Sequence, residues 1–449
     1  MRYSVIIRVG EHESKDIELL SEDSKVINVP FLNCDFSAKN RVKHEYIIDG
    51  LNRFRLIPSN LAMDLLVLSV GVLSADTRIN RGNESEDSWT REIDLYVPVS
   101  APAIWNNQKE NISVILGFLT GDRWRVSFRD GDYCYKGLFK NKRKKKATKP
   151  FKGNIVSLFS GGMDSFIGAI DLLENDFKPF LVGHRKSADV GGPQKKAYEY
   201  LEQQYSNRVG YVPFRLNTPK KIFHGGEEKS ERGRSFVFLS LGILVASALK
   251  GKSKLVVPEN GLISLNVPLS PLRLGSLSTR TTHPYYLKRF QQLIDSLGLN
   301  ISIENPYRFK TKGEMLSECK NNDRLKGFIS RTRSGAHPAA GRFRKDVGIG
   351  HCGVCVPCII RKASFNKAKK LITDSTDYKG DLTNVANRKY IQPFLRSIKR
   401  LNDNSGIEKY LILKSGPMFD YSQELGNYSD VYRRGMKEIE DLFACLNSC

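Results

Sequence analysis

Short apolar runs alternate with longer amphipathic segments after residue 150. The apolar runs predict strands at Asn154–Phe159, Phe180–His184, Tyr211–Phe214 and Leu255–Pro258. The segments between them predict helices over Ser165–Glu174, Gln194–Ser206 and Ser235–Lys250. Strands joined by crossover helices form a parallel sheet covered on both faces. Residues 151–375 are therefore predicted to form a doubly wound α/β domain, with ligands bound in the loops beyond the carboxyl ends of the strands.

The pattern before residue 140 is different and contains no motif with evident chemistry. Trp124–Arg129 alternates apolar and polar residues and predicts a strand. Asn60–Ala75 has apolar residues at helical spacing and predicts a helix, with Asn60 placed as its cap. Strands and turns around one helix indicate an α+β accessory domain over residues 1–140.

The two remaining segments carry less information. Residues 141–150 continue a basic run that starts at Lys140, and like charges in sequence favour a solvated linker over a dedicated nucleic-acid patch. Residues 376–449 predict a helical extension. In it Val431, Met436, Ile439 and Phe443 have the spacing of an amphipathic helix that packs on the core.

Composition places the chain among globular proteins, and its charge adds one possible class of partner. The 449 residues carry a formal charge of +23, so a nucleic-acid partner is possible. The first residues alternate like a strand and lack the apolar stretch of a secretory signal. Phe236–Leu249 is too short and too mixed to cross a bilayer. A cytoplasmic protein with no membrane partner is expected.

The loop Ser160-Gly161-Gly162-Met163-Asp164-Ser165 lies between a predicted buried strand and a predicted helix. Its glycines allow main-chain N–H groups to approach an anion, and the helix offers its positive N-terminal end. The serine hydroxyls add further donors. A phosphate site is favoured over the alternative of a plain glycine turn with Asp164 and Ser165 as helix caps.

This loop resembles the pyrophosphate-binding signature of the N-type ATP pyrophosphatases, whose members fold as adenine nucleotide alpha-hydrolase-like sheets and activate a substrate by adenylation. The resemblance implies that the loop residues bind the β and γ phosphates of ATP: Ser160, Gly161, Gly162, Met163, Asp164 and Ser165. It also implies that Asp164 is catalytic and lies near Mg²⁺, a cation suited to neutralising a pyrophosphate leaving group.

Three cysteines, Cys352, Cys355 and Cys358, are crowded into seven residues. Two residues between thiolates suit a turn around tetrahedral Zn²⁺, and disulfides are rare in a reducing compartment. The segment resembles the zinc knuckle of the 7-cyano-7-deazaguanine synthase (QueC-like) family. Where that family has its fourth cysteine, this chain has Gly335, so the fourth ligand stays open between the following residues: Cys319, His337 and His351.

Further residues match the same family less sharply. Arg234 precedes the predicted helix Ser235–Lys250, and Lys312 lies in a Thr-Lys-X-Glu segment, which makes both candidates for catalytic contacts to phosphate or adenylate. Glu259 and Asn260 follow a strand end and could bind the edge of a guanine-like substrate, whereas an exposed turn is the alternative. His184 ends another strand on the adenine side of the nucleotide.

The resemblance implies an enzyme that uses ATP to activate a 7-deazapurine carboxylate, 7-carboxy-7-deazaguanine, and yields an amide, a nitrile or a protein conjugate. Long chains of this build resemble the QatC-type components of bacterial antiphage defence, which implies a protein partner. Two other functions remain open. One is a tRNA-modifying thiolase or ligase, and the other is a non-catalytic scaffold that senses ATP.

Overall fold

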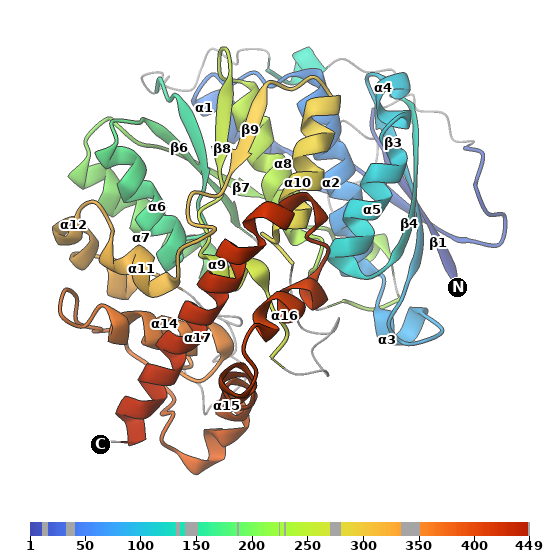
Figure 1. The fold of residues 1–449 in the computed structure, drawn as a ribbon. Helices are drawn as coiled ribbons and strands as arrows, with labels where there is room; N and C mark the ends of the chain where they lie inside the picture. Colours follow the sequence, from blue (N-terminus) through green and yellow to red (C-terminus); the bar gives the residue numbers. More distant parts are fainter. Residues whose placement is uncertain are drawn as a thin grey trace.

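Two β-sheets, each parallel throughout, form the framework of the molecule (Figure 1). The computed structural model describes residues 1–10, 17–32, 41–131, 135–139, 151–185, 188–223, 225–228, 230–269, 280–333 and 351–447. The basic segment 140–150 therefore lies outside the described residues, as do Gly335 and His337.

The second sheet has the order β7-β6-β5-β8-β9. Its strands are β5 (Ile155–Leu158), β6 (Pro179–Arg185), β7 (Gly210–Arg215), β8 (Ser253–Val256) and β9 (Ile301–Glu304). Its helices are α6 (Met163–Glu174), α7 (Ala188–Gln204), α8 (Arg234–Ser247), α9 (Gly261–Leu265), α10 (Pro284–Ser296), α11 (Lys312–Ser317) and α12 (Asn322–Lys326). The four predicted strands and three predicted helices are confirmed, whereas β9 and α10 were not predicted.

The strand order reverses between β5 and β8, since β6 and β7 extend the sheet from one side of β5 and β8 and β9 extend it from the other. Ligands of open α/β sheets bind in the crevice at such a switch point, beyond the carboxyl ends of the strands. The loops that follow β5 and β8 carry Ser160–Ser165 and Glu259–Asn260, respectively. The fold therefore brings two separate groups of predicted site residues to one edge of the sheet.

The first sheet corrects the α+β expectation for residues 1–140. Its order is β2-β1-β3-β4, and all three of its strand pairs are parallel. The strands are β1 (Arg2–Arg8), β2 (Lys25–Pro30), β3 (Glu92–Val99) and β4 (Arg123–Asp130), and the helices are α1 (Glu45–Arg53), α2 (Asn60–Arg78), α3 (Arg81–Glu84), α4 (Pro102–Asn106) and α5 (Lys109–Thr120). Helix α2, strand β4 and, from the alternation of the first residues, strand β1 were predicted there. The helices between β3 and β4 had been missed, so parallel pairing was not expected.

Helix α2 connects the two sheets. It packs against β1 and β3 on one side and against α8 on the other, while α8 covers β5, β6 and β8. One hydrophobic cluster consequently runs from the first sheet through both helices into the second. A Cβ atom on Gly71 of α2 would come within 2.5 Å of Ile7, so the helix lies directly on the first sheet.

This position explains the composition of α2. By length and apolar composition, Asn60–Arg78 is the one helix among the described residues that could cross a membrane, but 89% of its apolar window is buried inside the protein. A helix that is apolar on all sides suits a position between two packed layers. Its N-cap is Ser59, whose hydroxyl accepts a hydrogen bond from the N–H of Ala62 at 3.3 Å, and not Asn60 as predicted.

A buried ion cluster of Arg91, Asp76 and Asp122 connects residues 1–139, the first half of the molecule, to the start of α8. Arg91 is fully buried and donates hydrogen bonds to Asp122 at 2.7 Å and to Asp76 at 2.9 Å. The other carboxylate oxygen of Asp76 accepts the N–H of Gly233, the residue just before α8, at 2.8 Å. The first half is thus tied to the helix that carries Arg234.

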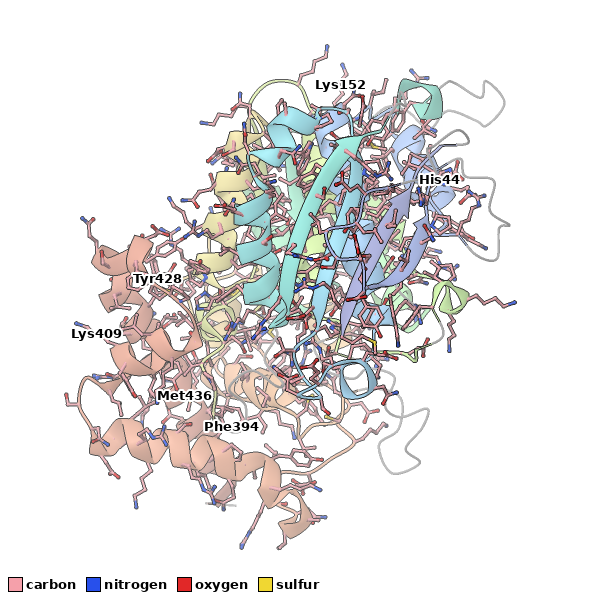
Figure 2. The ribbon with its side chains drawn as sticks, turned by 90° about the vertical axis from the view of Figure 1, so that its right-hand side faces the viewer. His44, Lys152, Phe394, Lys409, Tyr428 and Met436 are labelled. Atoms are coloured by element: carbon pink, nitrogen blue, oxygen red, sulfur yellow. The ribbon has the colours of Figure 1, made fainter. Side chains whose placement is uncertain are left out.

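The C-terminal helices gather at one end of the molecule, where Figure 2 labels Phe394, Tyr428 and Met436. They are α14 (Val356–Lys367), α15 (Arg388–Asp403), α16 (Ile407–Ser415) and α17 (Leu425–Asn447). Helix α17 packs against α9, α11 and α14 as well as α15 and α16. Val431, Met436, Ile439 and Phe443 are all buried, which confirms the predicted amphipathic helix.

We predict that Arg91→Met will destabilise the protein by about 3–5 kcal/mol, because it leaves the carboxylates of Asp76 and Asp122 buried with less compensation. Arg123→Met on the neighbouring strand is the matched control, since this arginine is 76% exposed and pairs with Glu92 at the surface. Urea unfolding of both variants measures the difference. Equal stability of the two variants would contradict the structural role of the cluster.

Candidate functional site

The loop between β5 and α6 has the form of an anion-binding turn. Gly161 has φ of +78°, a conformation that glycine adopts without strain, and Gly162 is the N-cap of α6. The Ser160 hydroxyl accepts the N–H of Gly162 at 3.2 Å and lies 3.1 Å from the Ser165 hydroxyl. Ser160 is exposed and Ser165 is buried, so the loop presents its first serine to solvent at the edge of the sheet.

Neighbouring elements fix this loop from two sides. The N–H of Arg333 donates to the carbonyl oxygen of Gly161 at 3.0 Å. The side-chain amide of Gln194 in α7 donates to the carbonyl oxygen of Ser160 at 3.1 Å. A Cβ atom on Gly161 would lie 2.9 Å from Gln194, so this close approach requires glycine as much as the dihedral angle does. Contacts from outside the motif therefore brace the loop.

Asp164 lies at the base of the loop and is only 5% exposed. One carboxylate oxygen forms a short ion pair with the ammonium group of Lys312, and the other accepts the side-chain N–H of Asn260 at 2.7 Å. Burial alone would raise the pKa of Asp164, but the charge of Lys312 and the surrounding hydrogen bonds lower it to about 2. Asp164 is therefore ionised throughout the physiological range, and three predicted site residues meet at one carboxylate.

Glu259 adds a second carboxyl group beside Asp164. Burial and the negative charge of Asp164 raise the pKa of Glu259 well above its usual value, which favours the protonated form of Glu259 beside the ionised Asp164. Lys312 supplies one positive charge to this pair. Two adjacent carboxyl groups fit a divalent cation such as Mg²⁺, whose charge would favour ionisation of both.

Lys312 reaches Asp164 because of how its helix begins. Thr311 is the N-cap of α11, its hydroxyl accepts the N–H of Glu314 at 3.0 Å, and the Glu314 carboxylate accepts the N–H of Thr311 at 2.9 Å. This capping box explains the threonine and glutamate of the Thr-Lys-X-Glu segment in structural terms. The lysine between them is the first helical residue and is 6% exposed.

Two other predicted residues do not reach this group. His184 is 2% exposed, and its Nε2 lies 3.2 Å from the carbonyl oxygen of Leu216, so it joins the ends of β6 and β7. Arg234 begins α8 and is partly buried, and burial lowers the pKa of its guanidinium. Among the described residues, no hydrogen bond or ion pair links Arg234 to Asp164.

The three cysteines form a compact cluster. Their sulfur atoms all lie within 4.8 Å of one another, and those of Cys352 and Cys358 are 3.9 Å apart. Two sulfurs bound to one tetrahedral Zn²⁺ at 2.3 Å would be about 3.8 Å apart. The interaction among the thiols lowers the pKa of Cys352 to about 2 and raises that of Cys358. The donor set therefore fits a metal such as zinc.

The candidates for a fourth ligand differ in position. Nε2 of His351 lies 3.0 Å from the carbonyl oxygen of Thr332, so it must carry the proton, and Nδ1 then lies 3.9 Å from the sulfur of Cys358. Cys319 is buried in another hydrophobic cluster, and burial raises its pKa to about 12. Only the three knuckle cysteines form the mutual donor group among the described residues.

The cysteine cluster and the loop share one hydrogen-bond network. Arg361 of α14 is fully buried and donates to the Thr332 hydroxyl at 2.9 Å, while His351 bonds to the Thr332 carbonyl. The next residue, Arg333, bonds to Gly161. The cysteine cluster thus supports Thr332 and Arg333, the segment that contacts the Ser160–Ser165 loop.

Sequence reasoning missed the residues that hold this site together. Gln194, Arg434 and Glu438 lie far from the motifs along the chain, and the last two belong to the terminal helix that had been assigned only a packing role. Arg361 follows Cys358 closely, but its contact with Thr332 was not anticipated. Their signal in the sequence is weak. Only a charged residue at a position that helical spacing buries, as at Glu438, would have indicated a polar contact.

Comparison with known proteins adds no family assignment, because no family model and no curated protein matches the chain. The fold and the two donor groups define an α/β protein with a candidate anion loop and a candidate metal site.

We predict that the purified protein carries about one Zn²⁺ per chain and that Cys358→Ser abolishes its retention, because a tetrahedral site with two thiolates binds far more weakly. Elemental analysis after dialysis measures the content. Cys445→Ser, at an exposed and separate cysteine, should leave it unchanged. Equal zinc in wild type and Cys358→Ser would rule out this donor set.

Proposed function

We propose that the chain is an ATP-dependent adenylating enzyme of the N-type ATP pyrophosphatase class. The observation that carries this proposal is the meeting of Asp164, Lys312 and Asn260 directly beneath the Ser160–Ser165 loop. An anion-binding turn, a buried positive charge and a polar strand end therefore lie together beyond the carboxyl ends of β5 and β8, where open α/β sheets bind their ligands.

In the proposed reaction, a carboxylate oxygen of the substrate attacks the α-phosphorus of ATP. The bond from that phosphorus to the bridging oxygen of the β-phosphate breaks, and pyrophosphate leaves. The N–H groups of the loop and the serine hydroxyls would bind the leaving phosphates, and the Lys312 ammonium would stabilise the negative charge that develops on them. Mg²⁺, bound near Asp164 and Glu259, would supply further charge neutralisation.

Asp164 has a positioning role in this proposal. A lysine ammonium buried to this degree requires a paired anion, and Asp164 provides it while also fixing Asn260. Glu259 is partly exposed and lies at the same strand end, so it could contact a substrate ring. This position supports Glu259 as a substrate-binding residue, whereas Asn260 is fully buried and its side chain is bonded to Asp164 and to the N–H of Ile263.

The three-cysteine cluster supports a closer proposal, namely that the enzyme is QueC-like and acts on 7-carboxy-7-deazaguanine. A nitrogen nucleophile would then displace AMP from the acyl-adenylate. Ammonia would give an amide. Adenylation of the amide oxygen by a second ATP, followed by cleavage of the C–O bond with loss of AMP and of the amide protons, would give a nitrile. A protein amine would give a conjugate, which is the outcome a defence partner would require. We further propose that His351 Nδ1 is the fourth zinc ligand.

We predict release of pyrophosphate and AMP when the purified protein is given ATP, Mg²⁺ and 7-carboxy-7-deazaguanine. Asp164→Ala should lower the rate by about 100-fold or more, because Lys312 loses the partner that positions it. Asp176→Ala, at the exposed end of α6, is the matched control. Coupled pyrophosphate detection and mass spectrometry of the products measure both steps.

Release that depends on the substrate and on Asp164 would support the enzyme and exclude the ATP-sensing scaffold. No release with this substrate, with or without added ammonia or protein partners, would contradict the QueC-like assignment.

One observation favours a second candidate function, an adenylating enzyme that acts on RNA. Helix α15 buries Phe394, Ile398 and Leu401 and exposes a row of cations on the opposite side. No ion pair links these cations to another described residue. They are Arg388, Lys389, Arg396, Lys399 and Arg400. A face rich in cations and poor in apolar side chains suits phosphate contacts better than a protein interface, whose centre is depleted in charge.

We predict, for this second candidate, that tRNA binds with an affinity that falls steeply with salt. Replacing Arg396, Lys399 and Arg400 by glutamate should make the slope of log affinity against log salt less steep by about two, since fewer counterions are released. Fluorescence anisotropy measures the slope. The charge-matched control replaces Lys250, Lys252 and Lys254, which are exposed elsewhere. Salt-independent binding, or equal slopes for both variants, would remove this candidate.

A further inference from the structure

The residues on either side of Lys312 contact the last helix of the chain. The Thr311 hydroxyl donates a short hydrogen bond to Oε1 of Glu438 in α17. The N–H of Gly313 donates to Oε2 of the same carboxyl group at 3.2 Å. Glu438 is 7% exposed, and Thr311 is fully buried. One buried carboxyl group therefore holds both neighbours of the lysine that pairs with Asp164.

Gly313 is required by this contact. A Cβ atom at position 313 would lie 2.5 Å from Oε1 of Glu438, closer than nonbonded atoms approach. Gly313 lies inside α11 and does not have a positive φ. A glycine here therefore provides space for Glu438 and not an unusual backbone conformation. The third position of the Thr-Lys-X-Glu segment is thus set by a side chain more than a hundred residues away.

A second side chain of α17, that of Arg434, contacts the start of α11. Arg434 lies one turn before Glu438 and donates to the two carboxylate oxygens of Glu314 at 2.7 and 3.2 Å. It also donates to the carbonyl oxygen of Phe309 at 2.8 Å. Helix α17 therefore contacts Phe309 before α11, Thr311 at its N-cap, and Gly313 and Glu314 in its first turn.

We propose that Glu438 is a positioning residue of the adenylation site, which fixes the start of α11 so that the ammonium group of Lys312 lies against Asp164. The catalytic consequence rests on the proposed function, whereas the structural contact does not. Under this proposal the C-terminal extension is part of the site, because Glu438 acts through the position of Lys312.

The protonation of Glu438 should make the contact between α17 and α11 depend on pH. Burial and the negative charge of Glu314 raise the pKa of this carboxyl group, the hydrogen bonds from Thr311 and Gly313 and the charge of Lys367 lower it, and the net result is a pKa of about 7. Arg434 on the same helix faces Glu314. Because the folded-state pKa lies above the unfolded one, the contribution of Glu438 to stability falls as pH rises through 7. The carboxylate form accepts both hydrogen bonds, so kcat should rise over the same range.

The structural test is hydrogen exchange of the amides of residues 311–317. Glu438→Ala should accelerate their exchange, Glu438→Gln should do so less because it keeps the shape, and Glu440→Ala at the surface of the same helix should not. Gly313→Ala should accelerate exchange in the wild type because it collides with Glu438. In the Glu438→Ala background the same change should have no such effect, since the space is then open.

The functional test is pyrophosphate release by the full-length variants. Glu438→Ala should lower kcat about tenfold or more while changing the KM for ATP less, because misplacement of a charged group weakens the transition state more than the ground state. Glu438→Gln should lose the ionisation near pH 7. In a Lys312→Ala background, Glu438→Ala should add little, since it acts through the lysine.

Each result decides the proposal. Exchange and kcat at wild-type levels in Glu438→Ala would overturn it, as would an equal effect of Gly313→Ala in both backgrounds. If the wild type releases no pyrophosphate, the proposed function fails, and the Gly313 and Glu438 exchange cycle still decides whether α17 positions α11. If Glu438→Ala does not fold, Glu438→Gln still tests the proposal, because wild-type exchange together with an unchanged ionisation of kcat near pH 7 would overturn it.

Discussion

The site depends on the buried ion pair between Asp164 and Lys312. Each charge is about 7% exposed, and neither could be buried without the other, because desolvation of an unpaired charge is unfavourable by several kcal/mol, roughly. The pair joins the start of α6 to the start of α11, which are 148 residues apart in the chain. Asn260 adds the loop after β8 to the same carboxylate. The need to pair the buried charge of Asp164 therefore brings together the starts of α6 and α11 and the loop after β8.

Further layers of support surround this pair. Arg333 and Gln194 hold the loop carbonyls, and Thr332 connects the loop to Arg361 and to His351 beside the cysteine cluster. On the other side, α17 holds α11. Metal binding at the cysteines would thus stabilise the Ser160–Ser165 loop through hydrogen bonds. The arrangement suits a reaction that relies on positioned charges more than on a general base.

The first half of the chain is structurally continuous with the second. Helices α2 and α8 share one hydrophobic cluster between two parallel sheets, and Asp76 binds the backbone at the entrance of α8. Arg234, the first residue of that helix, is consequently positioned from both halves. The α+β expectation was wrong because local patterns identify single strands and helices, whereas the direction in which strands pair depends on the full set of crossover helices, of which only α2 had been recognised.

The sequence by itself determined the local elements. The apolar runs specified four strands of the second sheet, and the Ser160–Ser165 and Cys352–Cys358 segments specified their own turns, because periodicity and glycine or cysteine spacing act over a few residues. Only the tertiary structure decided which side chains meet. It brought Lys312 and Asn260 to Asp164, left Arg234 and His184 apart from that carboxylate, and recruited Glu438 from the final helix. Contacts between distant segments follow from the packing of the sheets and helices, and no local pattern encodes them.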